Sequence, residues 1–200
     1  IEPFITAFPK EKSLLLDYYC EKKEVWQMTD KFFGVPYIWC YLGNFGGNSK
    51  LTGNLSEINK RIENTFANGG KNFSGIGATL EGFDCNPYIY EYVFEKAWDF
   101  PTHRNITEWV SKLADQRAGK ADRNAREAWQ LLVDSIYNTK SASSMKPFVD
   151  SRPVFKKKQS KNTYAKIAKE NRCLMSAIDK LLLVDSKQSS YKFDLANLTR

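Results

Sequence analysis

A single glutamate follows a buried strand pattern near the middle of the chain. The run Ser74–Leu80 is small and apolar, Glu81 comes directly after it, and Gly82 follows. Glycosidases hydrolyse their bond with a pair of Asp or Glu side chains, and α/β barrels carry such carboxylates at the ends of their strands. Exposed strand ends also carry acidic residues that have no catalytic role. Glu81 is therefore a candidate catalytic carboxylate, with an ordinary strand-end residue as the alternative.

The densest polar motif of the chain follows another strand pattern. Residues 37–48 read YIWCYLGNFGGN, an apolar run and then a turn that holds Asn44 and Asn48 among three glycines. Asn side chains donate to and accept from hydroxyl and acetamido groups, and glycines let a backbone approach a ligand. A plain glycine-rich turn fits the same residues. The spacing matches neither a phosphate-binding loop nor a dinucleotide-binding motif.

The two motifs meet if the two strands lie in one parallel sheet, because ligands bind at the carboxyl edge of such sheets. The amide groups of Asn44 or Asn48, or backbone N–H groups of the Gly46–Gly47 turn, would then donate to Glu81 and keep it ionised. No Ser or Cys nucleophile with a His base is indicated, because the one histidine, His103, falls beyond this region.

The elements that must position these residues alternate between strand and helix. One helical pattern runs through Leu51, Leu55, Ile58, Ile62 and Phe66 and is stopped by residues 68–70, and a second begins at Pro87. The predicted strands are Leu14–Tyr19, Tyr37–Leu42 and Ser74–Leu80. This order predicts a parallel α/β sheet, either a small open layer or the C-terminal portion of a (β/α)8 barrel.

The second half of the chain predicts only helices. Thr107 is suited to cap a helix that ends near Gly119. Two further helical patterns run over 125–136 and 164–182, separated by a Ser-, Lys- and Pro-rich loop at 139–160. We therefore predict two domains: residues 1–102, the C-terminal part of a (β/α)8 catalytic domain, and residues 103–200, the incomplete N-terminal part of an all-α domain.

Composition narrows the classes of protein. The formal net charge is +7, but the excess is concentrated in one stretch around Lys156–Lys158, without a recognisable nucleic-acid-reading motif beside it. The four cysteines have no CxxC spacing, and with a single histidine neither a metal site nor a cofactor site is predicted. No apolar run is long enough to span a membrane. We expect neither a nucleic-acid nor a membrane partner.

The motifs YIWCYLGNFGGN and GIGATLEG, with the Tyr90, Glu91 and Trp98 pattern of the next helix, resemble the α-N-acetylglucosaminidases of glycoside hydrolase family 89. The later stretches WVSKLADQRAG and AWQLLVDSIYN match in the same order but are less specific. The resemblance covers roughly residues 14–137. Some relatives carry His where this chain has Gly43 and Ser49, and Pro where it has Leu80, and these departures change the polarity of the rim.

The resemblance implies an enzyme that removes terminal α-linked N-acetylglucosamine from glycans with retention, through a glycosyl-enzyme intermediate. Glu81 looks like the family's nucleophile, and the wall of the sugar pocket would include Trp39, Cys40, Asn44 and Asn48. The general acid of the family lies on an earlier strand, so we expect this chain alone to be inactive. The implied location is extracytoplasmic: lysosomal in a eukaryote, periplasmic or secreted in a bacterium. The oligomeric state is left open.

A second interpretation is a non-catalytic fragment that binds carbohydrate or polyanions. The basic stretch after Phe155 would then hold a sulfated glycan, and the Asn-rich turn would be structural. The enzyme interpretation instead requires Glu81, Asn44 and Asn48 to share one rim.

Overall fold

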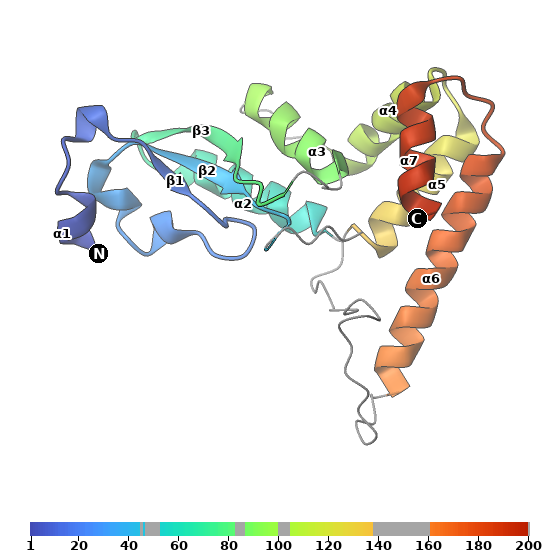
Figure 1. Cartoon of the computed structure of the whole chain (residues 1–200), viewed down its shortest axis with the longest axis horizontal. Helices are drawn as coiled ribbons and strands as arrows, with labels where there is room; N and C mark the ends of the chain where they lie inside the picture. The colour runs from blue at the N-terminus through green and yellow to red at the C-terminus, as the bar shows by residue number, and fades with distance from the viewer. Residues whose placement is uncertain (45, 47–52, 83–86, 100–104, 138–160, 200) are drawn as a thin grey trace. The chain divides into compact units, whose positions relative to one another are not determined.

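The computed structural model describes residues 1–44, 46, 53–82, 87–99, 105–137 and 161–199 (Figure 1). The chain divides into two compact units. One unit comprises Ile1–Leu51 and Leu55–His103, and the other Thr52–Asn54 and Arg104–Arg200. The first is a mixed α/β unit and the second is helical, so the predicted change of class from α/β to all-α is confirmed.

A three-stranded sheet in the order β1-β2-β3 forms the centre of the first unit. Both neighbouring pairs are parallel, with Leu16 opposite Ile38 and Ile38 opposite Gly75. The parallel pairing predicted from the sequence is therefore confirmed, although each strand ends earlier than its apolar run. The strands are β1 (Leu15–Asp17), β2 (Tyr37–Tyr41) and β3 (Phe73–Ala78).

Two helices accompany this sheet, and both were predicted from helical spacing. Helix α2 (Leu55–Asn68) connects β2 to β3, and α3 (Pro87–Trp98) follows β3. The helices are joined by the hydroxyl of Tyr92, which donates to Asn59 Oδ1. The remaining elements of this unit are short: α1 (Glu2–Ile5), η1 (Lys10–Lys12), η2 (Val25–Gln27) and η3 (Lys31–Gly34).

The two faces of the sheet have different surroundings. Side chains of a strand alternate between faces, and Tyr37, Trp39 and Tyr41 of β2 point toward the helices. The Tyr37 hydroxyl donates to the carbonyl of Gly69 after α2 at 3.0 Å, and the Tyr41 ring lies edge-on to Tyr90 of α3. The opposite face is more open within the described residues, since Leu16 is 53% exposed and Ile38 is half-buried.

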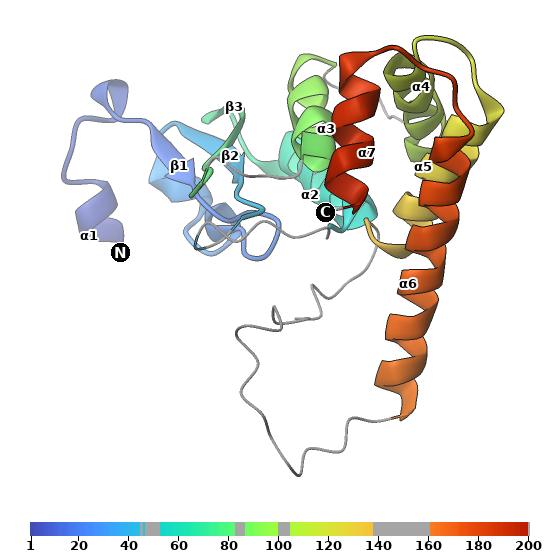
Figure 2. The ribbon, with the colours of Figure 1, turned by 45° about the vertical axis from the view of Figure 1, so that its right-hand side comes forward.

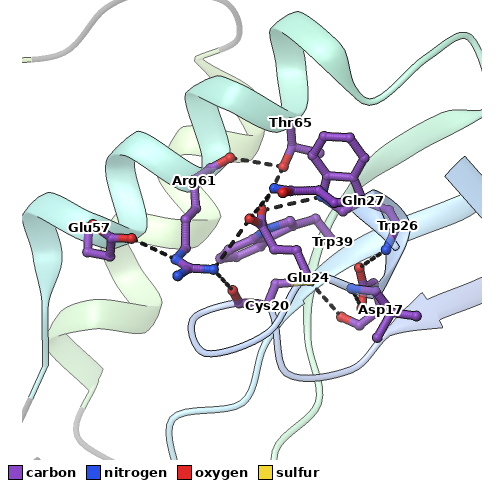
Figure 3. Close-up of polar contacts among 10 residues, drawn as sticks. Asp17, Cys20, Glu24, Trp26, Gln27, Trp39, Glu57, Arg61 and Thr65 are labelled. Carbon is purple, nitrogen blue, oxygen red and sulfur yellow. Dashed lines mark hydrogen bonds and ion pairs between the residues drawn. The ribbon is translucent and has the colours of Figure 1, made fainter. Parts of the chain in front are cut away.

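A buried carboxylate connects the sheet to α2 (Figure 3). Glu24 Oε1 accepts hydrogen bonds from Trp39 Nε1 at 2.9 Å, Thr65 Oγ1 at 3.1 Å and Trp26 Nε1 at 3.3 Å. Its Oε2 accepts from Gln27 at 2.7 Å and pairs with Arg61 Nη1 at 3.4 Å. We call Glu24 and these five partners the Glu24 cluster. A buried carboxylate needs such partners because its desolvation is costly.

The second unit contains α4 (Ile106–Ala118), α5 (Arg123–Ser135), α6 (Lys161–Leu182) and α7 (Ser189–Thr199). Helix α5 packs against both α4 and α6, and Figure 2 shows α6 as the long orange helix that leads to α7. Ion pairs join the helices: Lys180 to Glu127 at 2.5 Å, and Arg117 to Asp194 at 3.2 Å. The predicted loop at 139–160 lies outside the described residues.

The N-terminus of α4 corrects one prediction. Asn105, not Thr107, is the capping residue: its Oδ1 accepts from the backbone N–H of Thr107 at 2.9 Å and of Glu108 at 3.4 Å. The Thr107 position fails as a cap because its own N–H is one of the groups that the cap must satisfy. The predicted end is confirmed, since Gly119 adopts the left-handed conformation after α4. Among the described helices, none is long and apolar enough to cross a membrane.

The Glu24 cluster generates a prediction about stability. Changing Glu24→Gln keeps the shape but removes the charge opposite Arg61 and places an amide N–H₂ among groups that are themselves donors. We expect the free energy of unfolding to fall by about 3 kcal/mol, as measured by denaturant unfolding followed by tryptophan fluorescence.

The matched control is Glu57→Gln. Glu57 pairs with the same Arg61 at 3.0 Å, but at the surface and within one helix, so its loss should cost only about 0.5 kcal/mol. Equal effects of the two variants would show that Arg61, rather than the buried carboxylate, organises the cluster.

Candidate active site

The structure brings Glu81 and Asn44 together at the carboxyl edge of the sheet. The backbone N–H of Glu81 donates to Asn44 Oδ1 at 3.1 Å, and Asn44 Nδ2 donates to the carbonyl of Gly82 at 3.1 Å. The Asn44 side chain is buried, with 2% of the residue exposed, whereas Glu81 is exposed. Asn44 therefore fixes the backbone on both sides of the Glu81 side chain and leaves the carboxylate open to solvent.

Both oxygens of the Glu81 carboxylate accept hydrogen bonds. The Tyr18 hydroxyl donates to Oε1 at 2.6 Å, and the backbone N–H of Gly46 donates to Oε2. These donors stabilise the charged form, so first the Tyr18 hydrogen bond and then that of Gly46 lower the pKa of Glu81 below its ordinary value. The carboxylate is consequently ionised at neutral pH, as a nucleophile must be.

A tight turn after β2 aims Asn44 at Glu81. The N–H of Asn44 donates to the carbonyl of Leu42 at 2.8 Å, with Gly43 between them at φ 70°. A three-residue turn of this hand is strained for residues with a side chain, and glycine adopts it without that penalty. A Cβ on Gly43 would meet the Tyr41 ring at 2.7 Å and the Tyr90 hydroxyl at 2.8 Å.

A second carboxylate, Glu21, supports the same turn from the β1–β2 connection. Glu21 Oε1 accepts from the N–H of Gly43 at 2.6 Å, and Oε2 accepts from that of Leu42 at 3.2 Å. Burial raises the pKa of Glu21 despite these donors. Because both oxygens hold the backbone of the turn, Glu21 positions the Asn44 segment.

Two of the residues expected in the sugar pocket, Trp39 and Cys40, are not brought into contact with Glu81, and a third lies outside the described residues. Trp39 is completely buried, and its indole belongs to the Glu24 cluster on the helix side of the sheet (Figure 3). Cys40 is also buried and lies on the opposite face from Trp39, where its Sγ is 3.7 Å from the Cβ position of Gly77. Asn48 lies outside the described residues. The sugar-binding roles of these three residues stay predictions.

Sequence reasoning missed Tyr18, although it anticipated a donor from the Gly46 backbone. The expected Asn44 amide donates to the backbone beside Glu81 and not to its carboxylate. The apolar run predicts a buried strand through Tyr19, yet β1 ends at Asp17 and Tyr18 is 45% exposed. One signal could have identified Tyr18: it comes directly after a strand, at the same edge of the predicted sheet as the strand-end Glu81.

The described residues give little support to a cysteine nucleophile, a metal site or polyanion binding. Burial raises the pKa of the Cys40 thiol to about 11, so it is protonated at neutral pH and a poor nucleophile. No group of three or more His, Cys, Asp or Glu side chains that could hold a metal ion occurs in the part of the chain that the structure describes. Lys156–Lys158 of the polyanion-binding interpretation lie outside it.

An exposed carboxylate at the carboxyl edge of a parallel α/β sheet is the arrangement that barrel glycoside hydrolases use. Comparison with known families agrees with that class. Residues 1–100 match the model of the α-N-acetylglucosaminidase (NAGLU) tim-barrel domain, and residues 109–200 match the model of its C-terminal domain. The chain belongs to the α-N-acetylglucosaminidase family.

Individual relatives are consistent with this assignment. The chain is 34% identical to human alpha-N-acetylglucosaminidase over 138 residues, which is 69% of this chain and 19% of that protein. A family 89 glycoside hydrolase from Clostridium perfringens in complex with PUGNAc has the same fold, with a TM-score of 0.77 and 24% identity over 95% of this chain and 22% of that one. A structure of a Clostridium perfringens enzyme with its substrate GlcNAc-alpha-1,4-galactose superposes with a TM-score of 0.74, at 24% identity, over 92% of this chain and 21% of that one. The chain thus spans about a fifth of these relatives.

The Asn44 bridge generates a prediction about the site. Asn44→Ala leaves the N–H of Glu81 and the carbonyl of Gly82 without their partner, which should lower the free energy of unfolding by about 2 kcal/mol. Hydrogen exchange at the Glu81 amide should become faster. The Thr79 amide should keep its protection, because it donates to the carbonyl of Tyr41 at 3.0 Å independently of Asn44.

Asn68→Ala is the matched control, since its amide donates to the exposed Asn64 side chain at 2.8 Å within α2. It should change the stability by less than about 0.5 kcal/mol. Unchanged exchange at Glu81 in Asn44→Ala would contradict the role assigned to Asn44.

Proposed function

We propose that the protein carrying this chain is a retaining glycoside hydrolase that removes terminal α-linked N-acetylglucosamine, with Glu81 as its nucleophile. The observation that carries the proposal is the state of Glu81: an exposed, ionised carboxylate with a donor on each oxygen, at the carboxyl edge of a parallel sheet. Membership of the α-N-acetylglucosaminidase family supports the choice of sugar and linkage.

The reaction proceeds in two steps on this proposal. An oxygen of Glu81 attacks C1 of the sugar while the bond from C1 to the aglycone oxygen breaks, and the aglycone takes a proton from a second carboxyl group. Water then attacks C1 and gives its proton to that second group, and the bond between C1 and Glu81 breaks with its electron pair returning to Glu81. Two inversions at C1 give net retention.

The second carboxyl group has to lie about 5 Å from Glu81. Glu21 is a poor candidate, because both its oxygens accept backbone hydrogen bonds from the turn after β2. We assign the general acid to a residue outside these 200, in keeping with the share of the relatives that the chain spans. The chain alone is accordingly expected to be inactive.

We also propose that β1, β2 and β3 are the last strands of the (β/α)8 barrel. The parallel order of the strands supports this, as does the difference between the two faces, one covered by α2 and α3 and the other exposing Leu16. In a barrel the second face is the interior, which side chains of the other strands fill.

An extracytoplasmic location, lysosomal or secreted, fits a glycan substrate such as heparan sulfate and is tested by cell fractionation.

Glu81→Gln in the intact enzyme tests the function. The amide keeps the shape of the side chain but cannot form the glycosyl-enzyme bond, so turnover of an aryl α-N-acetylglucosaminide should fall by at least about a thousandfold. Glu81→Ala should be partly rescued by azide, which attacks C1 from the vacated side and releases the β-glycosyl azide.

Glu95→Gln is the matched control, an exposed carboxylate on α3. It should leave turnover close to that of the unaltered enzyme. Near-normal turnover in Glu81→Gln, or an azide product of unchanged configuration, would refute the nucleophile assignment.

A further inference from the structure

The orientation of the Glu81 side chain does not come from packing. Glu81 is exposed, and an exposed glutamate normally samples several rotamers. Within the part of the chain that the structure describes, no lysine or arginine pairs with it. Its orientation is set instead by the two donors, the Tyr18 hydroxyl on Oε1 and the Gly46 N–H on Oε2.

The position of Tyr18 is fixed by a hydrogen bond to its backbone carbonyl. The Thr79 hydroxyl donates to the carbonyl of Tyr18 at 2.7 Å, and the N–H of Thr79 donates to that of Tyr41 at 3.0 Å. Thr79 therefore ties together the ends of all three strands just before Glu81. Tyr18 is 45% exposed, so its hydroxyl is not a core group that needs a partner because of burial.

We propose that Tyr18 is a positioning residue for the nucleophile, which holds the Glu81 carboxylate in its attacking orientation and stabilises it as the leaving group of the second step. This rests on the proposed function of Glu81. Charge leaves the carboxylate when the bond to C1 forms and returns when that bond breaks. A hydrogen bond to the carboxylate is stronger than one to the ester, so removing the donor slows the release step most.

The surrounding titratable groups favour a neutral, donating Tyr18. The hydrogen bond to Glu81 raises the pKa of Tyr18, so the phenol stays protonated. The neighbouring Tyr19 is also held neutral, since burial and then the charges of Glu21 and Glu81 raise its pKa. Glu21 points its oxygens at the turn after β2. Tyr18 is therefore the side-chain donor to Glu81 among these described groups.

The test is Tyr18→Phe in the intact enzyme, with an aryl α-N-acetylglucosaminide whose leaving group is good enough to make release of the sugar rate-limiting. We expect kcat to fall about 10- to 100-fold, as loss of a hydrogen bond to a charged group predicts. KM should fall as well, because the glycosyl-enzyme accumulates.

The pH profile separates this role from a structural one. Removing the donor raises the pKa of Glu81 toward its ordinary value, so the acidic limb of kcat/KM should move to higher pH. Tyr19→Phe is the control, which removes the adjacent hydroxyl and should leave the acidic limb where it is.

A folded Tyr18→Phe enzyme with unchanged kcat and acidic limb would overturn the proposal. So would a fall in Tm that accounts for the lost activity, because the hydroxyl would then serve stability. If Glu81→Gln remains inactive in either case, the proposed function stands and only the role of Tyr18 fails. If Glu81→Gln is active, the proposed function fails first.

Discussion

The described α/β unit depends on the buried carboxylate of Glu24. The Glu24 carboxylate collects hydrogen bonds from the middle strand through Trp39, from α2 through Thr65 and Arg61, and from its own loop through Trp26. An unpaired carboxylate at this depth is strongly unfavourable, so the strand, the helix and the loop can only come together in the arrangement that pairs it. Hydrophobic burial supplies most of the stability, but it is less selective about register and rotation than these directional bonds.

The positions of the residues at the carboxyl edge depend on this arrangement, because the backbone of β2 leads directly into the site. Once β2 is fixed, the turn at Gly43 and the Glu21 carboxylate determine where Asn44 lies, and Asn44 determines the course of the chain through Glu81. The carboxylate is exposed, whereas Asn44 is buried and Glu21 is partly buried. That combination of an open side chain and a fixed main chain is what preorganised catalysis requires.

The sequence predicted the sheet and most helices correctly because their signals are local. The apolar runs of β2 and β3 and the helical spacing of α2 need no knowledge of distant contacts. The orientation of Trp39 was not predictable in this way. Every residue from Tyr37 to Leu42 is apolar or aromatic, so the run carries no alternation that says which side chains face the helices. The prediction of the residue that caps α4 was wrong for a different reason. Asn105 and Thr107 are both good capping residues, and they lie only two positions apart.

The hydrogen bond between Tyr18 and Glu81 joins residues that are 63 positions apart in the chain. Contacts of such long sequence separation form late, because the entropy of closing the intervening loop has to be overcome first. During synthesis, Tyr18 leaves the ribosome well before β3 has been made. The carboxylate therefore acquires its orientation only after all three strands have paired. A partly folded chain carries an unoriented glutamate, and its chemistry is delayed until the sheet is assembled.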